Sequence, residues 1–100
     1  MLLLPPTVTI AEARDTLRML AQVLPRVSDG EVTLDASGLT RFDTSALAVL
    51  LECRRLAQAS GRSFAVRRVP GKLSALAALY GVDALLFAAG PEAAQPVEGR

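Results

Sequence analysis

The sequence predicts an α/β domain in which helices pack against a small, mainly parallel β-sheet. The first observation behind this prediction is that short strand-like segments alternate with longer segments of helical periodicity, an order typical of parallel strands joined by helices. The second is the length of 100 residues, which suits one domain. The third is the 51% hydrophobic content, which is enough for a sizeable core and too high for a disordered chain.

The first part of the chain predicts a strand and a helix. Residues 2–4 form a brief strand or a frayed terminus, and two prolines then make an extended turn. Thr9 and Glu12 stand at capping-box spacing, which predicts a helix that begins at Ile10. The helix ends at Pro25, and from Ile10 onward its apolar residues recur at helical spacing, namely Ala13, Leu17, Leu20 and Leu24.

The middle of the chain predicts a second strand between a turn and a loop. The turn lies at 28–30 and the strand at 31–35. The alternation of polar and apolar residues puts Val32 and Leu34 on the buried face of the strand. Residues 37–41 then form a connecting loop.

The second predicted helix has signals at both ends. It begins at Thr44 or Ser45, reaches about Ser60, and is closed by Gly61 in the C′ position. A short strand at 63–67 follows it.

The last part of the chain predicts a third helix and a tail. The helix spans 72–80 and is stopped by Gly81, and one apolar face of it consists of Leu73, Leu76 and Tyr80. Residues 82–89 add a short strand or helix. The domain therefore covers 1–89, and residues 90–100, which lack apolar periodicity, are predicted to be a mobile tail.

Charge and residue usage exclude several classes of function. The net charge is +1 with acidic and basic residues mixed, so no basic patch indicates nucleic-acid binding. Histidine is absent and Cys53 is the only cysteine, which excludes disulfide scaffolds, ordinary zinc sites and histidine-based triads. We therefore expect no enzymatic activity, no metal and no cofactor. No apolar run is long enough to span a bilayer, and a lone cysteine fits the reducing cytoplasm.

The start of the second helix carries the first functional signal. Asp43 is a good N-cap, since its carboxylate can accept first-turn amides and complement the helix dipole. Thr44 and Ser45 then place hydroxyls beside free backbone N–H groups, where a phosphate would meet the positive end of the dipole. The alternative is simply a well-capped helix, and spacing alone favours that alternative.

The same helix carries a second stripe beside its core face. The core face contains Cys53 as a buried thiol, together with Ala46, Val49, Leu50, Leu56, Ala57 and Ser60. A separate stripe, called here the predicted stripe, consists of Leu47, Leu51, Arg54 and Gln58. Two leucines flanked by Arg54, Arg55 and Gln58 are typical of a partner-binding patch, unless another element covers them.

The residues around this helix start resemble the STAS-domain family. The resemblance extends from about Leu2 to about Leu86 and rests on segments 32–39 and 41–47 and on the leucine-rich helix that follows them. It implies the STAS-like (SpoIIAA-like) fold, an α/β fold with a small sheet. Within the family, the Asp43-Thr44 pair and segments 46–51 and 72–81 are similar to the MlaB-type subunits of phospholipid-transporting ABC complexes.

The MlaB-type resemblance implies a non-enzymatic, cytoplasmic accessory subunit held at the inner membrane through its partner complex. Such subunits bind the ATPase of the transporter, which acts with its permease, and support a complex that maintains outer-membrane lipid asymmetry. The family's important threonine follows the loop aspartate, which carries over to Thr44 after Asp43. The predicted stripe lies on the same helix, so a partner surface is expected at Asp43, Thr44 and the predicted stripe.

Two departures from the family pattern leave alternatives open. STAS domains begin with two strands and only 2–4 matches one of them, which predicts an exposed sheet edge that a homodimer or a partner would cover. Ser45 stands at the position of the phosphorylated serine of anti-sigma-factor antagonists. The alternative function is therefore an antagonist in a partner-switching pathway, with phosphorylation at Ser45 or Thr44.

Overall fold

Strands and helices alternate along the chain in the computed structural model, which describes residues 2–26 and 30–87. In chain order the elements are β1 (Leu2–Leu3), β2 (Thr7–Val8), α1 (Ile10–Val23), the 3₁₀ turn η1 (Leu24–Arg26), β3 (Glu31–Asp35), β4 (Arg41–Phe42), α2 (Thr44–Ala59), β5 (Ser63–Arg67), α3 (Gly71–Leu79) and α4 (Asp83–Phe87). The first two residues of the predicted turn and the predicted tail at 90–100 lie outside the described residues. The domain bounds 1–89 therefore stay a prediction.

Two parallel sheets form the strand layer. β1, β3 and β5 make a three-stranded sheet in the order β1-β3-β5, and β2 pairs with β4 in a two-stranded sheet. The register places Leu2 beside Leu34 and Val32 beside Phe64. All three strand pairs are parallel, because each pair is joined by a crossover that contains a helix. The predicted α/β fold with a mainly parallel sheet is confirmed.

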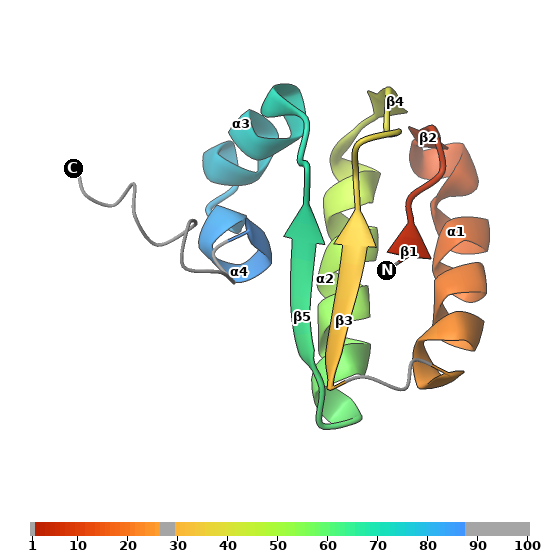
Figure 1. The fold of residues 1–100 in the computed structure, drawn as a ribbon. Helices are drawn as coiled ribbons and strands as arrows, with labels where there is room; N and C mark the ends of the chain where they lie inside the picture. The colour runs from red at the N-terminus through yellow and green to blue at the C-terminus, as the bar shows by residue number, and fades with distance from the viewer. Residues whose placement is uncertain (1, 27–29, 88–100) are drawn as a thin grey trace.

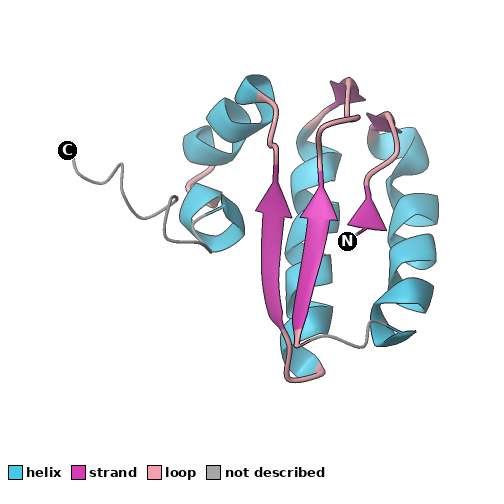
Figure 2. Ribbon diagram, viewed as in Figure 1, coloured by secondary structure: helices cyan, strands magenta, loops and turns pink. Residues whose placement is uncertain are grey.

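The helices bury one face of the larger sheet. Figure 1 shows α2 running behind β3 and β5, with α1 on one side of it and α4 on the other. α1 packs against α2, and α4 packs against both α2 and β5. The sheet face toward α2 therefore places Val32, Leu34 and Phe64 in the core. The strand arrowheads in Figure 2 point to the end of the molecule at which α1 and α2 begin.

Gly61 and Gly81 end α2 and α3, as the sequence predicts. Their φ angles of 76° and 73° lie in the left-handed region, where a residue with a side chain is strained. At Gly61 the turn closes by a hydrogen bond from the Arg62 N–H to the Ala57 carbonyl at 2.9 Å. The sharp entry into β5 therefore depends on the glycine.

The structure has two short strands, β2 and β4, where the sequence predicts only turns and loops. The carbonyl of Pro6 accepts hydrogen bonds from the N–H groups of Thr40 and Arg41 at 2.8 and 3.0 Å. These bonds join segments more than thirty residues apart. A two-residue strand has no periodicity, so no local pattern predicts it.

Helix ends also differ from the predictions. α1 ends at Val23, and Pro25 lies in η1. Residues 82–89, predicted as a strand or a helix, contain helix α4. Tyr80, predicted on the apolar face of the third helix, is 59% exposed, and Ile10, which opens the predicted apolar repeat of the first helix, is 79% exposed. Both lie where the chain enters or leaves a helix, so the helical repeat does not fix their environment.

β1 is a two-residue edge of the larger sheet. The Leu4 N–H donates to the Asp35 carbonyl at 3.0 Å and extends the pairing by one residue. Leu3 is 69% exposed. Pro5 and Pro6 follow at once and carry no N–H group, so this edge offers few backbone groups to another strand. The homodimer through this edge stays a prediction.

Candidate functional site

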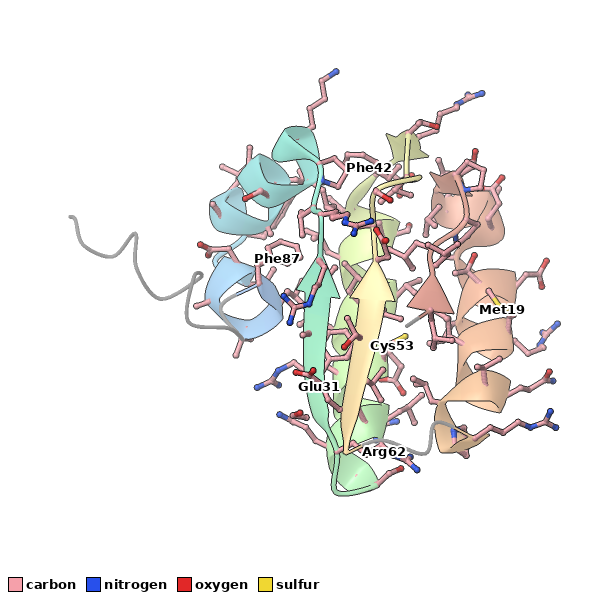
Figure 3. All side chains as sticks on the ribbon, in the orientation of Figure 1. Met19, Glu31, Phe42, Cys53, Arg62 and Phe87 are labelled. Atoms are coloured by element: carbon pink, nitrogen blue, oxygen red, sulfur yellow. The ribbon has the colours of Figure 1, made fainter. Side chains whose placement is uncertain are left out.

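A single carboxylate joins the N-termini of α1 and α2. Asp43 is the N-cap of α2, as predicted, and its Oδ1 accepts a hydrogen bond from the Ser45 N–H at 2.8 Å. Its Oδ2 accepts a second bond from the Ile10 N–H at 3.2 Å. The carboxylate therefore lies at the positive ends of two helix dipoles. Figure 3 labels Phe42, the residue before Asp43, at this end of the molecule.

These contacts lower the pKa of Asp43 below its ordinary value of 3.8. The largest cause is the hydrogen bond from the Ser45 N–H, and the Ile10 N–H and the Ser45 hydroxyl act in the same direction. The carboxylate is therefore ionised at neutral pH. Its negative charge therefore stabilises the N-termini of both helices and joins them.

Thr44 and Ser45 both lie in the first turn of α2, as predicted, but in different surroundings. Thr44 is exposed, whereas Ser45 is half-buried and its N–H is bonded to Asp43. Of the two hydroxyls, that of Thr44 is more open to a partner. Contact with a partner and modification of either residue stay predictions.

The predicted stripe does not form one exposed surface. Gln58 is exposed and Leu51 and Arg54 are half-buried, but Leu47 is only 5% exposed and belongs to the core. The prediction that Leu47 lies in an exposed patch is wrong. Because α1 and α4 both pack against α2, the buried arc of this helix is wider than the single face that periodicity assigns to the core.

The exposed side of α2 is rotated away from the predicted stripe. It consists of five residues, called here the α2 face: Thr44, Ala48, Arg55, Gln58 and Ala59. The spacing of these residues places them on one side of the helix. The sequence reasoning missed Ala48 and Ala59, and it named Arg55 only as a residue flanking the two leucines of the predicted stripe. An exposed alanine carries no signal in a hydrophobic pattern, and Arg55 pairs on the surface with Glu52 at 2.9 Å between Nε and Oε1.

A second carboxylate lies at the carboxyl end of β3. Asp35 is 3% exposed, and its Oδ1 accepts from the Ser37 N–H at 2.8 Å while its Oδ2 pairs with the Arg68 guanidinium at 3.2 Å. The hydrogen bonds from Ser37 are the main reason that the pKa of Asp35 is lowered. Arg68 has a left-handed φ of 56°, which is uncommon for a residue with a side chain. Asp35, like Asp43, is engaged in structural contacts.

The described residues offer neither a reactive thiol nor a metal cluster. Cys53 is fully buried, and burial raises the pKa of its thiol to about 12. Within 2–26 and 30–87, no three His, Cys, Asp or Glu side chains are placed to hold a metal ion. None of the helices in these segments is long and apolar enough to cross a membrane.

One family of known proteins matches the chain over most of its fold. A family model described as "Mlab, STAS domain" matches residues 7–87, from β2 to the end of α4. Among curated proteins, none matches the sequence. Domains of this family are small accessory or regulatory modules and are generally non-catalytic.

Proposed function

Because the chain belongs to the STAS-domain family of the MlaB type, we propose that it is a non-enzymatic accessory subunit of an ABC-type phospholipid transporter. In this function it binds the ATPase subunit, which acts with its permease, on the cytoplasmic side of the inner membrane. It supports the assembly and activity of a complex that maintains outer-membrane lipid asymmetry. The partner complex holds it at the membrane.

The α2 face is the observation that supports this proposal. The opposite side of α2 is buried against the sheet, and α1 and α4 pack on its flanks. Among the described residues, nothing covers the α2 face. The small side chains of Thr44, Ala48 and Ala59 allow a partner helix to approach closely, and Arg55 and Gln58 supply polar contacts around them.

Thr44 also supports the proposal, because the threonine that the family pattern marks as important is an exposed residue of the α2 face. It follows Asp43, whose two oxygens are occupied by the Ser45 and Ile10 N–H groups. The Thr44 hydroxyl makes no hydrogen bond within the part of the chain that the structure describes. It is therefore available to donate to, or accept from, a partner group.

The test replaces a small residue in the middle of the α2 face. Ala48→Glu puts a longer, charged side chain where a partner helix would pack, and glutamate keeps a high helix propensity. Ala75→Glu makes the same change at another exposed helical alanine, on α3, and is the matched control. Binding is measured by biolayer interferometry against the purified ATPase–permease complex from the same organism, and folding by thermal melting.

We expect both variants to melt like the parent protein. Ala48→Glu should weaken binding by at least about tenfold, whereas Ala75→Glu should leave binding unchanged. If the parent protein does not bind the ATPase complex, the proposed function is wrong. If Ala48→Glu binds at full affinity, the α2 face is not the docking surface.

The antagonist function in a partner-switching pathway remains the alternative. A phosphate on Ser45 would bring about two negative charges beside the Asp43 carboxylate, which already occupies the Ser45 N–H. Incubation with an anti-sigma kinase and ATP, followed by intact-mass measurement, tests the alternative, and an added phosphate on Ser45 would favour it.

A further inference from the structure

Ile10 is an exposed apolar residue next to the carboxylate that caps α2. It is the first residue of α1 and is 79% exposed. A single exposed isoleucine is ordinary on a protein surface. This one, however, donates its N–H to the same Asp43 carboxylate that caps α2. Ile10 and Thr44 therefore flank one group, and the start of α1 adjoins the α2 face.

Two exposed basic side chains lie on the elements next to this position. Arg14 is exposed and lies four residues after Ile10, which places it on the same side of α1. Arg41 is exposed on β4, two residues before Asp43. Arg41 pairs with Thr7 of β2, and β2 leads into α1, so Arg41 lies close to the start of α1.

The acidic side chains of these elements already have partners within the chain. Asp43 accepts from two helix N-termini, and Glu12 accepts from the Thr9 N–H at 3.0 Å. Asp15 pairs with Arg18, and Glu52 pairs with Arg55. Among the described residues, Arg14 and Arg41 have no such ion pair. The surface around Ile10 therefore presents an apolar centre and two guanidinium groups that form no ion pair with the described residues.

We infer that the docking surface continues from the α2 face onto the start of α1. Ile10 is its apolar anchor, and Arg14 and Arg41 are its basic rim. This surface binds an acidic segment of the partner ATPase that carries an apolar side chain. This inference rests on the proposed function and specifies the chemistry of the partner. At protein interfaces a few buried anchor residues dominate affinity, and charge pairs at the rim mainly set the association rate and its salt dependence.

The first test exchanges the anchor for a charge. Ile10→Glu removes the apolar side chain, and an acidic residue in the first turn of a helix is favourable, so α1 should stay folded. The matched control is Met19→Glu on the same helix. Met19 is 42% exposed, is labelled in Figure 3, and lies half a turn round the helix axis from Ile10. Binding to the purified ATPase–permease complex is measured as above.

We expect Ile10→Glu to weaken binding at least about tenfold and Met19→Glu to leave it unchanged. If Ile10→Glu binds like the parent while Ala48→Glu does not, the extension onto α1 is wrong but the proposed function stands. If the parent itself does not bind the ATPase complex, the proposed function fails first. If Ile10→Glu abolishes self-association in sedimentation experiments and not ATPase binding, the surface belongs to a second copy, and the inference is wrong.

The second test addresses the basic rim. Arg14→Glu and Arg41→Glu should each weaken binding several-fold and reduce its dependence on salt, because each removes a charge pair with the partner. Arg26→Glu, at an exposed arginine of η1, is the control and should do neither. Affinities that do not change with salt for the parent protein would contradict an acidic partner segment.

Discussion

Asp43 and Arg68 each hold together segments that are far apart in the sequence. Asp43 joins the starts of α1 and α2 through one carboxylate, and Arg68 reaches from the end of β5 to the buried carboxylate of Asp35. The N-cap role of Asp43 is predictable from its place before a helix. Its second bond, to Ile10, is not, because no local pattern reports a contact across the fold.

The Asp43 cap predicts a pH-dependent loss of stability in acid. Because the folded pKa is lowered, the stabilisation is complete above the ordinary value of 3.8 and is lost as the pH falls through the lower folded value. Asp43→Asn keeps the acceptor oxygen but has no charge to protonate. The melting temperature of Asp43→Asn should therefore lie below that of the parent at pH 7, by a few degrees. The two proteins should converge as the pH falls below 3.8.

A gap between the two melting temperatures that is constant from pH 7 to pH 2 would contradict this account. Asp43→Ala extends the comparison, because it removes the acceptor as well as the charge. It should melt below Asp43→Asn at every pH.

The left-handed backbone of Arg68 predicts a difference between glycine and alanine at that position. Arg68→Gly and Arg68→Ala both lose the ion pair with Asp35, so the comparison isolates the backbone. Alanine at a φ of 56° is strained and glycine is not. In urea unfolding, Arg68→Gly should be more stable than Arg68→Ala by about 1 kcal/mol. Equal stability would show that the segment relaxes to another conformation.

At the scale of the elements, α2 shows how much of the burial of a helix can be predicted from its hydrophobic periodicity. The predicted core face is largely right, since Ala46, Val49, Leu50, Cys53 and Ala57 are all buried. The predicted stripe is wrong at Leu47, because a helix with neighbours on both flanks buries more than one face. Which residues of α2 are exposed depends on where α1 and α4 pack, and the sequence of α2 does not contain that information.

Two leucines of the predicted stripe should differ in their contribution to stability. Leu47 is buried in the core, so Leu47→Ala should lower the free energy of unfolding by about 2–5 kcal/mol. Leu51 is half-buried at the margin of the core, so Leu51→Ala should cost distinctly less. Urea unfolding of both variants measures the difference. If the two losses are equal, Leu47 is not more deeply packed than Leu51.

At the scale of the whole molecule, the fold class was more predictable than the site. The order of strands and helices follows from periodicities of two and 3.6 residues, and the ends of α2 and α3 follow from Gly61 and Gly81. The strands β2 and β4 exist only because two distant segments meet, and the exposure of Ile10 depends on the geometry at a helix end. Local patterns predict elements, whereas the functional surface arises from contacts between them.

The titratable residues predict a broad plateau of stability around neutral pH. The chain has no histidine, the side chain that ordinarily titrates between about pH 5 and 8. Above pH 9, the thiol of Cys53 ionises in the unfolded chain but stays protonated in the folded protein until about pH 12, so stability falls as the pH rises through this range.

Urea unfolding at a series of pH values measures this plateau. Cys53→Ala should show a shallower decline between pH 9 and 12 than the parent protein, whatever its stability at pH 7. An equally steep decline in the variant would assign the alkaline loss to other groups.

The parallel pairing of all three strand pairs also constrains the order in which the chain can fold during synthesis. Each strand can form its pair only after the ribosome has added more than thirty further residues. The pairs are Leu2 with Leu34, Thr7 with Arg41, and Glu31 with Ser63. No strand pair in the described segments is a local hairpin. α1 can form as soon as it emerges, but β1 gains its first neighbour only when β3 has left the exit tunnel. Of the helices, α1 can therefore form before any strand pair does.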